Sequence, residues 1–478
     1  MKRLMTVAAC AALLTACQDS PNPLTPETPS SVLLVNNLVK VDPVLTTLLN
    51  SSSPTDKLQV LVTFDEALTS ADVVSRAAQS LGAGVIRFKH LPVVFALATP
   101  AQVASLSGLP GVQSLYANKQ LTYYAENIAS IRADVAQSSG YTGKGVGIAI
   151  LDSGVDGLYS PDVKHPTRTI QNVKYVADLN DIVTFGDGVP AMGGDLYVEN
   201  VPNSETSTGH GTHVAGIAAG DGTASGGAYR GVAPGANIIG IGAGDILFVL
   251  WTLAGFDYIL DNHEKYNIQV VNNSWGSTGE YDPLDPINVA TKKVYDRGIA
   301  VVFAAGNEGP GENTLNPYSA APWVISVAAG CNTTAADPTD SRSQCSDAGK
   351  VLADFSSRGI RGHTLVHPDI TAPGSYIVAA RASLGAVING TALPSDVGNC
   401  AIATELLPFY TCISGTSMAA PHVAGAIALM EEASRGTMTP AQAYSAITRT
   451  ARPLSGRALW EVGSGYLDAY AATRAVKR

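Results

Sequence analysis

The stretch VGIAILDSG at residues 146–154 decides the fold of this 478-residue chain. Its first six residues are almost purely apolar, as expected of a strand buried on both faces of a parallel sheet. The run ends at Asp152, so a carboxylate stands at the carboxyl end of a buried strand, where α/β folds place functional groups. A lone Asp-Ser-Gly more often just begins a turn, so a functional role for Asp152 depends on the rest of the chain.

The composition excludes several classes of protein. Hydrophobic residues make up 46% of the chain and charged residues only 15%, whereas a disordered chain has few apolar and many charged groups. The net charge of −10 comes from scattered residues, and no run of Lys and Arg forms a basic stripe. We therefore expect no nucleic-acid partner. The only apolar segment with membrane character is at the start, which excludes a polytopic membrane protein.

Two histidines stand in the segment GHGTHVAG at residues 209–216. Its small residues favour a closely packed helix that brings His210 near whatever lies opposite. Two histidines three residues apart share a helical face, so a zinc pair is an alternative. However, the H-E-x-x-H pattern is missing and no third ligand cluster follows nearby. We expect His213 to be a packed, hydrogen-bonded residue.

A serine with the features of a nucleophile lies in the segment SGTSMAAPHVAG at residues 414–425. Ser417 is expected to open a helix with Pro421 in its first turn. The unpaired N–H groups of a helix start favour nearby negative charge, which suits a carbonyl that becomes an oxyanion. A serine hydroxyl needs an adjacent base, which His210 can be, and Asp152 can orient the imidazole. The chain order Asp, His, Ser differs from that of α/β-hydrolases, so an esterase of that class is the weaker alternative.

Together these three blocks resemble the subtilisin-like serine proteases, the subtilases, from about Tyr141 to the C-terminus. A fourth block, FAAGNEG at residues 303–309, is similar to the family segment that carries the oxyanion-hole Asn, here Asn307. A fifth, NSWG at residues 273–276, resembles the strand that lines the primary specificity pocket. The resemblance implies a three-layer α/β domain with a mainly parallel sheet.

The activity implied by the resemblance is hydrolysis of peptide bonds in proteins through Asp152, His210 and Ser417, with no cofactor required for the chemistry. Subtilases usually bind an extended peptide as an added strand, so the backbone of Ser274, Trp275 and Gly276 would form one edge of the cleft and specificity would be broad. Glu308 would modestly favour positively charged side chains. A catalytically silent binding module is the remaining alternative; the joint presence of the triad and Asn307 disfavours it.

A smaller domain is predicted at residues 55–122, before the peptidase domain at residues 123–478. Its apolar pattern indicates the order β-α-β-β-α-β, which is a ferredoxin-like α+β arrangement. This unit is similar to the inhibitory pro-domain of subtilases. The resemblance implies a self-processing zymogen, inhibited by its own pro-domain, with a junction between Lys119 and Asn127. We expect the mature enzyme to be a monomer.

The first residues have the pattern of an export signal. Lys2 and Arg3 precede a short apolar run, which ends in LTAC at residues 14–17. This ending resembles the lipobox of bacterial lipoproteins, so Cys17 is the candidate lipidation site; an ordinary signal peptide is the alternative. Residues 18–54 are rich in Pro, Ser, Thr and Asn and are expected to form a flexible linker. The protein is thus expected outside the cytoplasm, extracellular or in the cell envelope, touching the membrane only through a lipid.

Four cysteines remain after the signal, Cys331, Cys345, Cys400 and Cys412. They allow three pairings, of which the two local pairs are the most economical; a metal or redox site is the weaker interpretation because C-x-x-C is absent. The family often binds structural calcium, and Asp162 falls where a calcium ligand commonly lies; its alternative role is a solvated loop carboxylate. Residues 164–207 and 331–349 exceed the compact family pattern and are expected to be surface insertions.

Overall fold

The computed structural model describes residues 39–41, 43–87, 93–117, 130–175, 197–205, 208–243, 249–283, 285–331, 352–363, 365, 367–383, 386–389 and 395–478. The chain divides into two compact units, Met1–Thr122 and Tyr123–Arg478, and each is described by itself. Among the described helices, every one is too short or too polar to cross a membrane.

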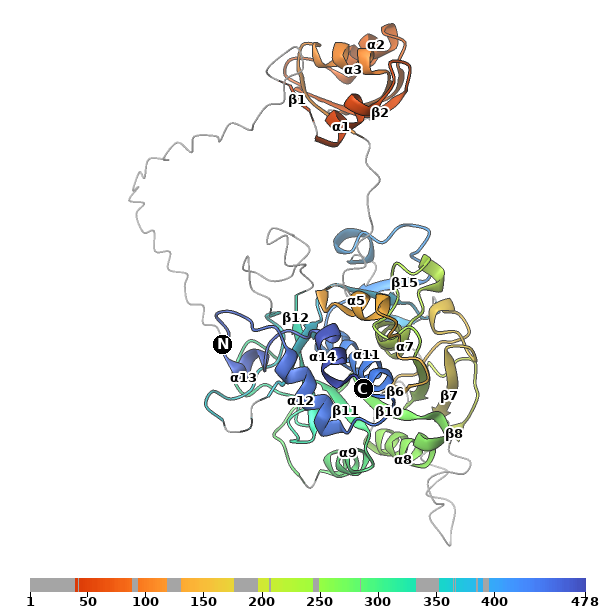
Figure 1. Ribbon diagram of the computed structural model, residues 1–478, viewed down its shortest axis with the longest axis vertical. Coiled ribbons are helices and arrows are strands. Elements are labelled where there is room, and N and C mark those ends of the chain that lie inside the picture. The colour runs from red at the N-terminus through yellow and green to blue at the C-terminus, as the bar shows by residue number, and fades with distance from the viewer. Residues whose placement is uncertain are drawn as a thin grey trace, which may run out of the picture. The chain divides into compact units, whose positions relative to one another are not determined.

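The smaller unit contains a five-stranded sheet in the order β1-β5-β2-β4-β3 (Figure 1). Strands β2 to β5 with helices α2 and α3 follow the predicted β-α-β-β-α-β order, and β2 pairs antiparallel with both β4 and β5. The elements are β1 (Lys40–Val41), α1 (Pro43–Ser51), β2 (Leu58–Phe64), α2 (Ala71–Ser80), β3 (Gly84–Arg87), β4 (Val93–Ala98), α3 (Pro100–Ser107) and β5 (Val112–Ala117).

This unit begins earlier than the predicted boundary at residue 55. Residues 39–51, which the composition assigns to the linker, contain a short strand and a helix. Strand β1 pairs parallel with β5, and Val41 and Leu45 are buried in the core of the unit. The assignment to a linker is wrong for these residues because their apolar stretch, which the sequence shows, is too short to predict a strand and a helix by its period alone.

The larger unit is built on an eight-stranded sheet in the order β13-β12-β11-β10-β6-β9-β7-β8. All neighbouring strands are parallel except the edge pair β7 and β8. The strands are β6 (Gly147–Asp152), β7 (Thr169–Tyr175), β8 (Tyr197–Val198), β9 (Asn237–Gly242), β10 (Ile268–Asn273), β11 (Ala300–Ala304), β12 (Val324–Gly330) and β13 (Ile370–Pro373); a separate hairpin pairs β14 (Ile377–Ala380) with β15 (Tyr410–Ile413).

Helices cover both faces of this sheet. Along β6, Ile148 and Ile150 enter the core beneath α7, α11 and α14, whereas Ala149 and Leu151 enter the opposite core beneath α8 and α9 (Figure 1). Both sets are buried because successive strand residues point to opposite faces. The three-layer α/β domain with a mainly parallel sheet is therefore confirmed. The helices are α5 (Ala133–Ser138), α7 (His210–Ala219), α8 (Val249–Tyr266), α9 (Pro286–Asp296), α11 (Thr416–Ser434), α12 (Pro440–Thr450), α13 (Leu459–Val462) and α14 (Ala469–Val476).

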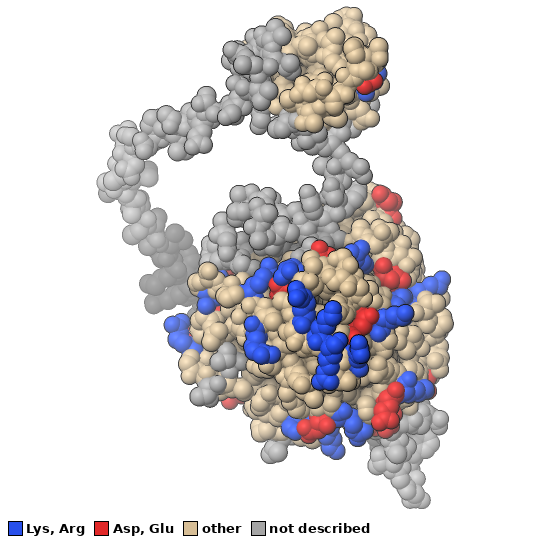
Figure 2. Space-filling view, viewed as in Figure 1, with Lys and Arg blue, Asp and Glu red and all other residues tan. Residues whose placement is uncertain are grey.

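The surface carries a grouping of cations that the linear sequence does not reveal. Figure 2 shows Lys and Arg side chains gathered over the face that bears α12 and α14 in Figure 1, with acidic side chains among them. Arg132 and Arg474 both lie over the ring of Tyr470, at 5.0 and 5.8 Å, and Arg132 also pairs with Asp468. Because these residues come from separate segments, no basic run marks them in the sequence.

The central helix α11 contains a buried carboxyl group, Glu431, which is 3% exposed. Burial raises its pKa from 4.5 to about 7, against the opposing hydrogen bond from Ser434. The folded state therefore favours the protonated form. The resulting stabilisation is complete below pH 4.5 and is lost as the pH rises through about 7.

Glu431→Gln, which stays neutral at every pH, is thus expected to raise the stability of the fold at pH 8 by about 2–3 kcal/mol and to change it little at pH 4.5. Thermal unfolding at both pH values checks this, in a background that carries Ser417→Ala and so lacks the predicted nucleophile. The control Glu264→Gln alters a carboxylate that is 90% exposed and is expected to show no such pH dependence. An equal gain at both pH values would contradict the assignment of burial as the cause.

Candidate active site

Asp152 and His210 meet at the carboxyl edge of the sheet. Asp152 ends β6 and is 1% exposed, and its Oδ1 lies 2.7 Å from Nδ1 of His210, the first residue of α7. The same carboxylate oxygen accepts the Ser153 N–H at 2.8 Å. Helix α7 approaches this closely because Gly211 has no side chain: a Cβ there would lie 2.2 Å from the Gly154 carbonyl oxygen. The contact with Asp152 thus fixes Nδ1 of His210 and leaves Nε2 available to accept a proton.

The charge environment raises the basicity of His210. Burial alone lowers its pKa, but the charge and hydrogen bond of Asp152, together with the charge of Glu205, outweigh that effect and raise the pKa above 6.5. Glu205 is buried, and its Oε2 accepts the Thr212 hydroxyl at 3.0 Å. Sequence reasoning missed Glu205, because no local pattern shows that it folds back beside the start of α7.

Ser417 lies in the first turn of α11, with Thr416 as the first helical residue. Its hydroxyl donates to the Ser274 carbonyl oxygen at 2.8 Å. Although Ser417 and His210 are both described, no hydrogen bond joins them in this state. Such bonds are often long or missing in an enzyme without substrate. The N–H of Ser417 has no partner among the described residues, as expected this close to a helix start.

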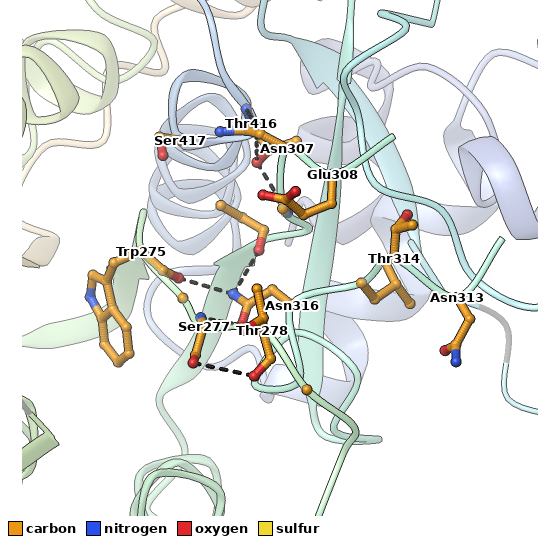
Figure 3. A pocket seen from close by; sticks show the side chains of 15 residues that line it. Trp275, Ser277, Thr278, Asn307, Glu308, Asn313, Thr314, Asn316, Thr416 and Ser417 are labelled. Atoms are coloured by element: carbon orange, nitrogen blue, oxygen red, sulfur yellow. Dashed lines mark hydrogen bonds between the residues drawn. The ribbon is translucent and has the colours of Figure 1, made fainter. Parts of the chain in front are cut away.

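Asn307 is oriented by the residue before Ser417. Its Oδ1 accepts both the N–H and the hydroxyl of Thr416, each at 2.9 Å (Figure 3). With the oxygen occupied in this way, the Nδ2 group remains as the free donor. Asn307 and Ser417 line one cavity, so an amide donor and a hydroxyl share a wall of it. The role of Thr416 in this orientation was not predicted.

This cavity, of about 520 Å³, runs from Ser417 between the segments 275–279 and 313–316. Asn316 ties the two segments together, since its Nδ2 donates to the carbonyl oxygens of Trp275 and Ala304 at 3.0 and 3.1 Å (Figure 3). Gly276 permits this contact, because a Cβ there would lie 2.3 Å from the Asn316 amide. Nothing in the local sequence distinguishes Asn316 from other loop asparagines.

The three residues predicted to bind substrate take different positions. Trp275 and Gly276 line the cavity, whereas Ser274 is buried beneath it and contacts Ser417. The Trp275 indole points away from the cavity: its N–H donates to the Leu151 carbonyl oxygen at 2.8 Å, and the ring packs on Phe303 at 5.0 Å. Only the backbone of this segment therefore borders the cavity at Trp275.

His213 has the packed role predicted for it. It is fully buried, and its Nε2 lies 3.1 Å from the carbonyl oxygens of both Ile377 and Thr411, which links α7 to the β14–β15 hairpin. Burial lowers its pKa to about 3. The Nε2 that faces these two carbonyl oxygens carries the proton and donates to them, so His213 serves in packing.

Asp162 does not fit the predicted calcium ligand. It is 2% exposed; its Oδ1 accepts the Ala224 N–H at 2.9 Å, and its Oδ2 accepts the Tyr410 hydroxyl at 2.6 Å. Calcium takes six to eight oxygen ligands, whereas hydrogen-bond donors face this carboxylate, and burial raises its pKa. Within the described ranges, no three His, Cys, Asp or Glu side chains gather as a metal site. Spacing in the sequence could not show that Tyr410, so distant along the chain, occupies this carboxylate.

The cysteines are described in part. A disulfide joins Cys400 to Cys412, which are 12 residues apart, and Cys331 is also disulfide-bonded. Its predicted partner Cys345 and the predicted lipidation site Cys17 lie outside the described residues.

Comparison with known proteins places the chain in a family. The family model for the subtilase family, Peptidase S8, matches residues 143–466. Serine protease AprX of Bacillus subtilis is 30% identical over 362 residues, covering 72% of this chain and 71% of that protein. Subtilisin E of the same species is 28% identical over 400 residues, covering 81% and 82% of the two chains.

A solved structure agrees with these sequence relatives. Sphericase superposes with a TM-score of 0.51 at 25% sequence identity, covering 73% of this chain and 98% of that chain. The matched region contains the Asp152–His210 pair, Ser417 and the cavity beside it. The chain belongs to the subtilase family and is a serine-type endopeptidase.

Proposed function

We propose that Asp152, His210 and Ser417 form the catalytic triad with which this protein hydrolyses peptide bonds in proteins. The observation that carries the proposal is the 2.7 Å contact between Asp152 and His210, at the edge of the sheet where α11 presents Ser417 beside a cavity. A carboxylate that fixes an imidazole near a serine is the arrangement that activates a hydroxyl as a nucleophile.

The chemistry follows from these positions. When the Ser417 Oγ attacks the scissile carbonyl, its proton passes to Nε2 of His210, and Asp152 stabilises the imidazolium without accepting the proton. The Asn307 Nδ2 group and the Ser417 N–H donate to the developing oxyanion. The proton then moves from His210 to the leaving amine, and water attacks the acyl-enzyme by the reverse route to regenerate Ser417.

Substrate is proposed to bind as an extended strand beside Ser274, Trp275 and Gly276. Hydrogen bonds between main chains carry no side-chain information, so we infer broad specificity. Glu308 lines the same cavity and is exposed, which favours a positively charged substrate side chain there. The substrates are proteins or peptides.

The remaining proposals concern maturation and location. The smaller unit, extended to begin near residue 39, is proposed to act as an intramolecular inhibitor that self-cleavage releases. Residues 1–17 are proposed to direct export, with lipidation at Cys17 as the anchor before maturation. If Cys17 is lipidated, cleavage near Tyr124 frees the protease and leaves the pro-segment at the membrane.

A fluorophosphonate probe tests the assignment of the triad directly. It forms a covalent bond with an activated serine hydroxyl, with loss of fluoride. Peptide mass spectrometry is expected to find the adduct at Ser417 in the wild-type enzyme and no adduct in His210→Ala. An enzyme that digests protein while the adduct forms at another serine would overturn the assignment. An enzyme that cleaves only small esters would favour the esterase alternative.

Asn307→Ala is expected to lower kcat roughly 100- to 1000-fold with little change in KM, because the lost donor acts on the oxyanion of the transition state. Steady-state kinetics on a peptide amide substrate measures this. Asn262→Ala is the control: it removes an Asn whose amide donates to the Tyr258 carbonyl oxygen on α8, and unchanged kinetics are expected. A large rise in KM with kcat preserved would instead indicate that Asn307 only binds substrate.

A further inference from the structure

Helix α11 lacks one of its own hydrogen bonds at the position of Ser417. The sequence suggests Pro421 in the first turn, but the helix begins at Thr416, so Pro421 lies one turn further inside. Proline has no N–H and cannot donate to the carbonyl four residues earlier, which is that of Ser417. The proposed nucleophile therefore sits on a carbonyl group that the helix leaves without its regular donor.

The side chain of Ser274, the residue after β10, replaces that donor. The Ser274 hydroxyl donates to the Ser417 carbonyl oxygen at 2.7 Å, while the Ser417 hydroxyl donates to the Ser274 carbonyl oxygen at 2.8 Å. The Asn272 Nδ2 group donates to the Ser274 Oγ at 2.9 Å. Because an amide N–H only donates, it turns the Ser274 proton toward Ser417. Ser274 and Asn272 are 2% and 0% exposed, so water does not compete for these bonds.

We propose that the Ser274 hydroxyl is a positioning group for catalysis, which stands in for the missing N–H of Pro421 and fixes the first turn of α11. This turn carries both the Ser417 Oγ and the Ser417 N–H, so one bond sets the nucleophile and an oxyanion donor together. The inference rests on the proposed role of Ser417. It assigns to the side chain of Ser274 a function separate from the backbone role that the sequence predicts.

We expect loss of the Ser274 hydroxyl to lower kcat and not to change KM. Ser274 is buried below the cavity and does not line it, so its hydroxyl does not contact bound substrate. Ser274→Ala keeps the backbone carbonyl and removes only the hydroxyl. We expect kcat and the rate of phosphonylation at Ser417 to fall about tenfold, the scale of one buried hydrogen bond, while KM and the pH profile of kcat/KM stay as in the wild type.

Ser434→Ala is the matched control, because Ser434 is also buried and its hydroxyl donates to a carbonyl of the same helix, that of Glu431, at 3.1 Å at the opposite end. A loss of thermal stability without a change in kcat is expected there. If Ser274→Ala behaves in the same way, the hydroxyl is merely structural and the proposal fails.

Pro421→Ala provides a second, independent test by restoring an N–H that can donate to the Ser417 carbonyl. In that background, removal of the Ser274 hydroxyl is expected to lower kcat only about twofold, because the carbonyl keeps a donor. An undiminished tenfold penalty in the double variant would show that Ser274 acts by some route other than this carbonyl.

Phosphonylation distinguishes failure of this inference from failure of the proposed function. Labelling of the wild type at a residue other than Ser417 rejects both. Labelling of the wild type at Ser417, with Ser274→Ala labelled at the wild-type rate, rejects the positioning role alone.

Discussion

Ser417→Ala is expected to lower kcat for casein hydrolysis by about a millionfold, the scale of loss when a triad nucleophile is removed. Without the hydroxyl no acyl-enzyme forms. His210 and the oxyanion donors then assist only a poorly placed water. Binding is expected to survive in Ser417→Ala protein from which an added protease has removed the smaller unit, because the cavity walls at segments 275–279 and 313–316 are unchanged. A peptide inhibitor is expected to bind this processed variant with nearly the wild-type Kd.

The control for this variant is the thermal unfolding of its processed form, expected to match that of the inhibited, processed wild type to within a few degrees, since Ser417 is only partly buried. Protein hydrolysis within tenfold of the wild-type rate by a folded Ser417→Ala enzyme would contradict the assignment. Tight peptide binding by both forms, with hydrolysis by neither, would instead support the catalytically silent binding module.

Asp152→Asn is expected to lower kcat about 10⁴-fold, because an amide that donates toward Nδ1 favours the wrong imidazole tautomer. It also removes the principal influence that raises the pKa of His210, so burial then dominates. Activity requires neutral His210. The acidic limb of the pH profile of kcat/KM is therefore expected above pH 6.5 in the wild type and at lower pH in the variant.

Glu205→Gln distinguishes the effect of Glu205 on the pKa of His210 from that of Asp152. Glu205 raises the pKa of His210 only through its charge and ranks behind Asp152, so a smaller shift of the limb in the same direction is expected, with a far smaller loss of kcat. Asp296→Asn, on the exposed end of α9, is the control and leaves the limb in place. A limb that stays fixed in Asp152→Asn would mean that another group sets the pH dependence.

The sequence carries much of this architecture because the features concerned are local. The apolar run 146–151 predicts a doubly buried strand, and the structure has β6 at Gly147–Asp152. Small residues around His210 predict a close approach of its helix, and Gly211 permits the approach to Asp152. The catalytic roles of these residues stay predictions until the variants are measured.

The features of the site that could not be predicted from the sequence depend on contacts between distant segments. The fold creates contacts that no spacing encodes: Glu205 lies where its charge acts on His210, Thr416 holds Asn307, and Ser274 bonds to Ser417. The surroundings of Asp162 could not be predicted for the same reason: the hydroxyl of the distant Tyr410 donates to its carboxylate, which does not suit the predicted calcium ligand. Helix α11 begins at Thr416, one residue before the predicted start at Ser417, and Pro421 lies in its second turn and not in the first as predicted.

Intact mass with N-terminal sequencing, on wild type and Ser417→Ala expressed side by side, tests the central claim of a self-processing protease. The predicted result is a new N-terminus within about ten residues of Tyr124 in the wild type and an uncut junction in the variant. This junction lies outside the described residues. Two uncut chains would contradict self-processing, and two chains cut at the same bond would assign the cleavage to another protease.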